Sequence, residues 1–398
     1  CIYIFRIMEI IWATLLLMYF TSVLSNSIRE RNTSTKALPD KLIIGYPTDS
    51  SCDDKIIEAV KNGVNVVIWF SISLSVSETG EPTIINGPDW SCVADKVKEI
   101  RDLGLDTVHL ISIGGWNAPH PDTSNPVAEV YKHFDRWNRE EIADPTKGFF
   151  GFDGFDWDIE GNDDPNSPYN HFTVECLDFM GRFSQLAKLE GNYLVSMVPA
   201  ESYLDPTMSS FDRSLLHTYP EWVEINNNFA YHGLNAYAYI LAKYGFYSEK
   251  YGFLVNEKEK DKKPTFDFIT IQLYESYAHA EYNTSVVGTS PINYLINYIP
   301  SVLKGWKVDF STDKDLNFPH ISDIDISKTQ FVVGLANGWA GNGRCVLMYP
   351  EEVGKAYEQL VKLNLEPRGF AFWDIQDEGK ASDQNPIIPV WIASGLNR

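Results

Sequence analysis

The chain has 398 residues and a formal net charge of -21, with an isoelectric point near 4.7. Nucleic-acid binding depends on clustered Lys and Arg, so this charge balance argues against a nucleic-acid partner and favours a neutral or cationic substrate. Hydrophobic residues make up 44% of the chain, which permits a large core. The length fits two average domains or one barrel of alternating strands and helices.

Residues 1–25 have the pattern of a secretory signal peptide with a few residues upstream of it. Met8 is the first plausible start, the apolar core spans residues 10–20, and small residues at positions 23 and 25 predict cleavage before Asn26. The apolar core is too short for a comfortable membrane span, so we expect no membrane attachment after cleavage. An uncleaved amino-terminal anchor is the alternative.

Residues 26–40 are polar and predicted to be disordered, and apolar strand-like runs then alternate with helical patterns to the end of the chain. The eight runs cover residues 41–47, 64–72, 107–115, 151–161, 193–201, 266–274, 330–337 and 369–377. Between them lie amphipathic stretches such as 54–62 and 94–103, each followed by a glycine that ends a helix. Eight such units predict an α/β protein, a (β/α)8 TIM barrel that forms a single domain over residues 41–398. An open doubly wound sheet is the alternative, but no Gly-rich phosphate loop follows the first strand.

The cysteines and the glycosylation acceptors agree with export. Cys52 and Cys92 each open a predicted helix on the same side of the sheet, so they are the pair that we expect to form a disulfide. Asn32 and Asn283 each begin an Asn-X-Ser/Thr tripeptide, the acceptor for N-glycosylation. No Cys-X-X-Cys pair is present and the eight histidines are scattered without metal-ligand spacing, so we expect no metal and no other cofactor.

Four acids occur within the fourth apolar run: Asp153, Asp156, Asp158 and Glu160. Side chains alternate across a strand, so the last three project from one side at about 7 Å per step, and Asp153, of opposite parity, has a structural role. Repulsion and burial should raise the pKa of at least one carboxyl and leave a protonated acid beside an ionised one. This is the requirement for general acid catalysis at a glycosidic oxygen. A solvated acidic turn is the alternative, but the flanking aromatic residues favour a buried strand.

Chemistry in a barrel of this kind takes place at the carboxyl ends of the strands. Polar or aromatic residues follow several of the predicted strands and should gather at one rim with Glu160; they are Trp116, Glu201, Tyr274 and Trp373. The long connection 202–265 is rich in tyrosine and is expected to wall one side of a cleft.

The acidic strand matches in full the signature Asp-x-x-Asp-x-Asp-x-Glu of glycoside hydrolase family 18, the chitinase family, which this chain resembles. Further elements recur in order on the expected strands. Ser112-Ile113-Gly114-Gly115 is similar to the family's Ser-x-Gly-Gly element, and Gln272-Leu273-Tyr274 resembles its Gln-x-Tyr element. Trp373 falls where the family has its eighth-strand tryptophan.

The resemblance implies a (β/α)8 barrel that hydrolyses β-1,4 linkages between N-acetylglucosamine units with retention, by substrate-assisted catalysis. In that mechanism Glu160 protonates the leaving oxygen, and the acetamido oxygen of the substrate attacks the anomeric carbon. Asp158 would orient the acetamido N–H and stabilise the oxazolinium intermediate, while Asp156 shares a proton with Asp158.

The same resemblance assigns substrate contacts. Tyr274 would hydrogen-bond the acetamido group and Trp373 would stack under the sugar ring. Further contacts are expected from Met197, Gln272, Trp116 and Tyr203, the last two in neighbouring subsites. Glu275 stands where relatives commonly have Asp or Asn, and Asp374 and Asp377 add negative charge beside Trp373, which leaves the fine substrate preference open.

We therefore expect a secreted chitinase, found outside the cell or in the lumen of a secretory compartment, that acts on chitin or N-acetylglucosamine oligosaccharides as a monomer. Endo action is expected because the seventh connection, residues 338–350, is short and lacks a wall-forming insertion. One alternative is a chitin-binding lectin on the same barrel, which would usually lose the proton donor. Another is an endo-β-N-acetylglucosaminidase acting on the cores of N-linked glycans.

Overall fold

The computed structural model describes residues 36–48, 50–216, 234–249, 261–275, 278–318, 320–337, 339–340 and 345–378. The predicted signal peptide with its start at Met8, most of the polar segment 26–40, and the glycosylation acceptor Asn32 lie outside the described residues and stay predictions.

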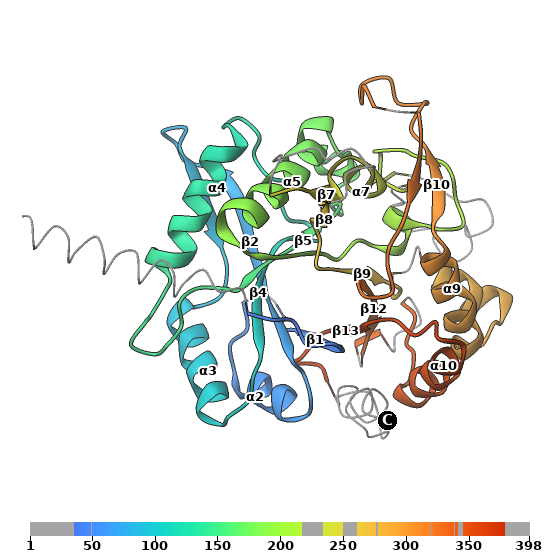
Figure 1. Cartoon of the computed structure of the whole chain (residues 1–398), viewed down its shortest axis with the longest axis horizontal. Helices are drawn as coiled ribbons and strands as arrows, with labels where there is room; N and C mark the ends of the chain where they lie inside the picture. The colour runs from blue at the N-terminus through green and yellow to red at the C-terminus, as the bar shows by residue number, and fades with distance from the viewer. Residues whose placement is uncertain are drawn as a thin grey trace, which may run out of the picture. The chain divides into compact units, whose positions relative to one another are not determined.

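Eight parallel strands form a closed barrel, and helices lie around its outside (Figure 1). The strands are β1 (Leu42–Tyr46), β2 (Val66–Val76), β4 (Val108–Gly115), β5 (Gly154–Ile159), β6 (Leu194–Met197), β9 (Phe268–Gln272), β12 (Phe331–Ala336) and β13 (Gly369–Trp373). Each pairs with its neighbour, and β1 pairs with both β13 and β2, which closes the sheet. The prediction of a single-domain (β/α)8 TIM barrel is confirmed, and each of the eight predicted runs overlaps one barrel strand.

The main helices connect successive strands. They are α2 (Asp54–Lys61), α3 (Trp90–Asp102), α4 (Val127–Arg136), α5 (Val174–Leu186), α7 (Ala238–Tyr244), α8 (His279–Glu281), α9 (Pro291–Lys304) and α10 (Pro350–Leu363). Helix α2 lies within the predicted range and ends just before Gly63. Helix α3 begins four residues earlier than predicted, because the Asp89 side chain accepts hydrogen bonds from the backbone N–H groups of Ser91 and Cys92.

Two antiparallel hairpins extend the barrel beyond what the strand pattern predicts. Strand β2 runs past its predicted end at residue 72 and pairs with β3 (Pro82–Asn86). Strand β10 (Trp306–Asp309) pairs with β11 (Ile321–Ile324) between α9 and β12. A short pair, β7 (Phe246–Tyr247) with β8 (Lys263–Pro264), lies in the long connection after β6.

Apolar side chains form two layers, one on the outer face of the barrel strands and one inside the barrel. The outer and larger layer packs between strands and helices, and it receives Phe155, Trp157 and Ile159 from β5. The indole N–H of Trp157 donates to Ser184 of α5 at 2.8 Å. The inner layer is smaller and contains every second residue of several strands, such as Leu42, Ile44, Val66, Ile68, Val108 and Leu110. Side chains alternate between the two faces of a strand, so Asp156 and Asp158 lie on the inner face of β5, opposite Phe155, Trp157 and Ile159.

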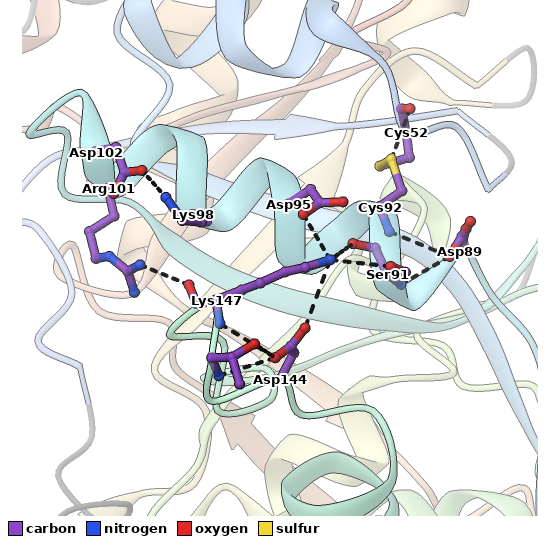
Figure 2. Close-up of polar contacts among 11 residues, drawn as sticks. Cys52, Asp89, Ser91, Cys92, Asp95, Lys98, Arg101, Asp102, Asp144 and Lys147 are labelled. Carbon is purple, nitrogen blue, oxygen red and sulfur yellow. Dashed lines mark hydrogen bonds and ion pairs between the residues drawn. A yellow bond between two sulfur atoms is a disulfide. The ribbon is translucent and has the colours of Figure 1, made fainter.

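A disulfide and a lysine fasten elements to α3 (Figure 2). Cys52, just before α2, is bonded to Cys92 in α3, which confirms the predicted pair. The Lys147 ammonium lies 2.7 Å from Asp95 Oδ1 and 3.2 Å from Ser91 Oγ, and Arg101 donates to the Lys147 carbonyl oxygen at 2.8 Å. These contacts hold the turn that precedes β5 against α3.

Within the described part of the chain, no helix has the length and apolar character needed to cross a membrane. The same residues contain no group of three His, Cys, Asp or Glu side chains placed to hold a metal ion.

Candidate active site

Three acids of the acidic motif lie on the inner face of β5 or directly after it. In the strand register Asp156 lies between Ser112 of β4 and Ser196 of β6, and Glu160 follows the last strand residue, Ile159. Asp156, Asp158 and Glu160 are 0%, 7% and 5% exposed. Strand alternation therefore places three buried carboxyls at the carboxyl end of the barrel.

Asp156 is the deepest of the three and is held by two hydroxyl groups. Tyr46 at the end of β1 donates to its Oδ2 at 2.9 Å, and Ser196 donates to its Oδ1 at 2.5 Å. Burial raises the pKa of Asp156 to about 7, against the opposing effect of these two hydrogen bonds. Asp156 is thus poised to exchange a proton near neutral pH.

Asp158 and Glu160 form a hydrogen-bonded pair. Burial and the negative charge of Glu160 raise the pKa of Asp158 well above its usual range. Burial also raises the pKa of Glu160, although its hydrogen bonds to Asp158 and Gln272 oppose the shift. The pair therefore keeps a proton to higher pH than two isolated carboxyls would. We expected Asp158 to share a proton with Asp156, whereas in this structure its hydrogen-bond partners are Glu160 and Gln272.

Gln272, at the end of β9, bridges the two carboxyls. Its amide nitrogen lies 2.7 Å from Glu160 Oε1, 3.2 Å from Asp158 Oδ1 and 2.6 Å from the carbonyl oxygen of Val198. Gln272 is 2% exposed, so these bonds form out of contact with bulk water.

The Gly114-Gly115 pair lets β4 approach the acidic strand. Gly114 has a φ of +110°, and a Cβ there would lie 2.4 Å from the carbonyl oxygen of Asp158. A Cβ on Gly115 would lie 2.3 Å from the Phe70 ring. Ser112, in the same motif, is fully buried beside Asp156 in the register. The two glycines therefore allow β4 and Phe70 to pack closely around the acidic strand.

An aromatic group that comes from β1, β2, β13 and the end of β9 borders the acids. The Trp373 ring packs edge-on against Phe70 at 4.7 Å and lies 6.2 Å from the Tyr46 ring. Tyr274, just past β9, is half-buried, and burial and the charge of Glu275 raise the pKa of its hydroxyl well above 10.0. Trp373 and Tyr274 thus lie near the acids, and their contacts with a substrate stay predictions.

Trp339 was not among the predicted site residues, but it contacts two that were, Trp373 and Tyr274. Its indole N–H donates to the Trp373 carbonyl oxygen at 2.6 Å, and its ring meets that of Tyr274 edge-on at 5.7 Å. An aromatic residue directly after the seventh predicted strand was the signal that could have identified it.

The rim after β4 carries Trp116 and His120. Trp116 is half-buried, and its ring lies against Gly161, where a Cβ would be 3.3 Å from the ring.

His120 Nε2 donates to the carbonyl oxygen of Glu160 at 2.9 Å, and its ring stacks on Phe172 at 4.9 Å. Burial lowers the pKa of His120 to about 4, so the ring is neutral at pH 7. His120 was missed because only the folded loop brings it to Glu160.

Two predicted substrate contacts lie elsewhere. Met197 pairs with Trp157 in the register and shares its outward face, so it packs under the helices with no exposed surface. Tyr203 is also 0% exposed, with its ring stacked on Tyr237 at 5.8 Å. Neither side chain offers a surface to a sugar, so both predictions are wrong.

Three further residues named in the sequence analysis make hydrogen bonds to other parts of the protein. Asp153 accepts a hydrogen bond from the backbone N–H of His109 at 2.9 Å, which fits its expected structural role. Glu201 is fully buried, bonded by Tyr294 and by the N–H of Ala280, so it faces α8 and α9 rather than the rim; burial raises its pKa to about 7. The side-chain amide of Asn283 donates to the carbonyl oxygen of His279, and its glycosylation stays a prediction.

The comparison with known proteins identifies similar folds only. No protein-family model and no curated protein sequence matches the chain. Among solved structures, concanavalin B aligns with a TM-score of 0.52 and 13% identity, over 89% of this chain and 98% of that one. A GH18 chitinase from Pseudoalteromonas aurantia aligns with a TM-score of 0.50 and 14% identity over 89% and 99%. The C-terminal domain of Legionella pneumophila ChiA gives 0.50 and 14% over 84% and 93%. At these identities the likeness shows the fold.

Proposed function

We propose that this protein, which has the barrel fold of the GH18 chitinases, is a glycoside hydrolase that cleaves β-1,4 bonds next to N-acetylglucosamine units in chitin or its oligosaccharides. The observation that carries the proposal is the hydrogen-bonded pair of buried carboxyls, Asp158 and Glu160, at the carboxyl end of the barrel. A protonated acid and an aromatic platform, Trp373, are what cleavage of a sugar bond requires.

In the proposed mechanism Glu160 transfers its proton to the glycosidic oxygen as the bond to the anomeric carbon breaks. The acetamido oxygen of the substrate attacks that carbon from the other side, so the reaction needs no protein nucleophile. Asp158 leaves its hydrogen bond with Glu160 and accepts one from the acetamido N–H, which stabilises the positive oxazolinium ion. Water then opens this ion with Glu160 as the base, and the configuration is retained.

Asp156 and Gln272 support the charges in this cycle. Asp156 accepts hydrogen bonds from Tyr46 and Ser196, which stabilise its ionised form, and its negative charge helps the Asp158–Glu160 pair keep the proton that Glu160 donates. Gln272 donates to both members of the pair and stabilises whichever carboxylate is ionised. Tyr274 lies close enough to Asp158 and Glu160 for their charges to raise the pKa of its hydroxyl, which supports its proposed contact with the acetamido group.

We further propose that the protein is secreted, that it acts as a monomer and that it cuts within chains. The Cys52–Cys92 disulfide supports an oxidising compartment. The short connection between β12 and α10 supports an open cleft, because it leaves no room for a large inserted domain.

The decisive experiment incubates the protein with N-acetylglucosamine oligomers and, in parallel, with an N-glycoprotein, and identifies the products by mass spectrometry. Cleavage of the oligomers, with the β-anomer formed first in an NMR time course, is the expected result. Cleavage of the glycoprotein alone would indicate an endo-β-N-acetylglucosaminidase. Binding of oligomers without cleavage of either substrate would indicate a lectin and would overturn the proposed activity.

A further inference from the structure

The loop after β4 and the segment after β5 are joined by one carboxylate, that of Asp163. Its Oδ1 accepts the indole N–H of Trp116 at 2.9 Å, and its Oδ2 accepts the side-chain amide of Asn117 at 2.7 Å. The Asp163 backbone N–H donates back to Asn117 Oδ1 at 2.8 Å. Both oxygens of the carboxylate are therefore directed at residues of the neighbouring loop.

This cluster lies directly beside the proton donor. Gly161, the residue after Glu160, accepts a hydrogen bond from the Asn117 backbone N–H at 3.0 Å. Gly161 is also the residue against which the Trp116 ring lies, and a Cβ there would be 3.3 Å from the ring. Asp163 follows two residues later. The indole is thus held against the backbone that carries Glu160.

The bond to the indole is not needed to join the two segments, because the three bonds of Asn117 to Gly161 and Asp163 already do so. What the indole bond adds is the orientation of a half-buried ring. An N–H bond to a carboxylate is charge-assisted and directional, and it removes rotations that a tryptophan side chain otherwise makes at a surface. A ring that is ordered before the sugar arrives spares the entropy of ordering it during binding.

We propose that Asp163 is a positioning residue: through the indole N–H it fixes Trp116 as a platform for the sugar that adjoins the bond cleaved by Glu160. This inference rests on the proposed function and adds to it a residue outside the signature motif. In this proposal Asp163 acts on the substrate only through Trp116. Removing the Asp163 carboxylate therefore weakens binding of the substrate and of the transition state alike.

The test is a double-mutant cycle with three variants: Asp163→Ala, Trp116→Phe, which keeps an aromatic ring but lacks the N–H, and the two combined. The control is Asp164→Ala, which removes the same charge one residue away; among the residues that the structure describes, its side chain bonds only to Asn166. Asp163→Ala should raise KM for oligosaccharides about 5-fold and change kcat less than about 2-fold. Asp164→Ala should leave KM unchanged.

In the Trp116→Phe background, Asp163→Ala should raise KM by less than about 2-fold, because the bond on which it acts is already absent. Effects that multiply fully in the double variant would overturn the proposal, and so would an unchanged KM in Asp163→Ala. A fall in kcat equal to that in kcat/KM would assign Asp163 a different role.

An NMR experiment on the free protein separates this inference from the proposed activity. The indole N–H signal of Trp116 is identified by its disappearance in Trp116→Phe. It should move upfield and exchange faster with solvent in Asp163→Ala and stay in place in Asp164→Ala. A signal that does not respond to Asp163→Ala would contradict the positioning role even in an active enzyme. A responsive signal in a protein that cleaves no oligomer would contradict the activity alone.

Discussion

The amide nitrogen of Gln272 lies 2.7 Å from Glu160 Oε1, so the group expected to donate a proton is itself held by a donor from another strand. A donor facing a carboxyl group favours its ionised form and lowers its pKa. The same nitrogen also bonds Asp158. Gln272, which the family resemblance predicts to contact substrate, is therefore engaged with Asp158 and Glu160 in the free protein.

Gln272→Leu should shift the pH dependence of the reaction. Loss of the donor raises the pKa of Glu160, so the acid stays protonated to higher pH and the alkaline limb of kcat/KM moves up by about one pH unit. The measurement is a pH profile on a soluble oligosaccharide. A rise in KM with an unmoved alkaline limb would show that Gln272 serves substrate binding alone.

Glu160→Gln should lower kcat by about 10²- to 10⁴-fold while oligosaccharide binding survives, because the amide keeps the shape of the side chain but has no proton to transfer. Calorimetry of binding and a turnover assay on the same preparation provide the two readings. The matched control is Glu281→Gln, a buried glutamate on α8 bonded to Ser285 away from the acidic strand. Equal turnover in the Glu160 variant and the unaltered protein would rule out the assigned acid.

The barrel and the acidic strand were predictable because their signals are local. Alternation of apolar runs with helical patterns gave the eight strands, and the two-residue period of β5 placed Asp156 and Asp158 on the inner face. The disulfide between Cys52 and Cys92 followed from the same strand and helix order.

The errors concern contacts between distant segments. Met197 was expected in the site, but the pairing of Asp156 with Ser196 puts Ser196 on the inner face of β6 and Met197 on the outer one. Such a register joins strands about 40 residues apart and is not visible in either strand alone. For Trp339 the sequence carried a signal, an aromatic residue just past a predicted strand, but its contacts with Tyr274 and Trp373 appear only in the folded protein.

Asp156→Asn should change how stability depends on pH. Burial raises the pKa of Asp156 from 3.8 to about 7, so between these values the folded protein binds a proton that the unfolded chain does not. The stabilisation from that proton is complete below about pH 4 and is lost as the pH rises through about 7. The variant cannot titrate there, so its free energy of unfolding relative to the unaltered protein should rise by up to about 4 kcal/mol between pH 4 and 8.

Urea unfolding across that pH range measures the difference. Ser196→Ala provides a second reading, because loss of its hydroxyl raises the pKa of Asp156 further and moves the loss of stability to higher pH. A difference between Asp156→Asn and the unaltered protein that stays constant with pH would show that Asp156 is not the titrating group.

Lys147→Met should loosen the turn that leads into β5. The lysine contacts Asp95 and Ser91 of α3, and its backbone is held by Arg101 (Figure 2). Lys98→Met is the control, since Lys98 pairs with Asp102 within the same helix and joins no separate segments. We expect Tm to fall by about 2 °C in Lys147→Met and by less in Lys98→Met, because only the first variant separates two elements. Thermal melts at low and high salt measure both, and an equal fall in the two variants would show that the contact between the turn and α3 adds nothing beyond a surface ion pair.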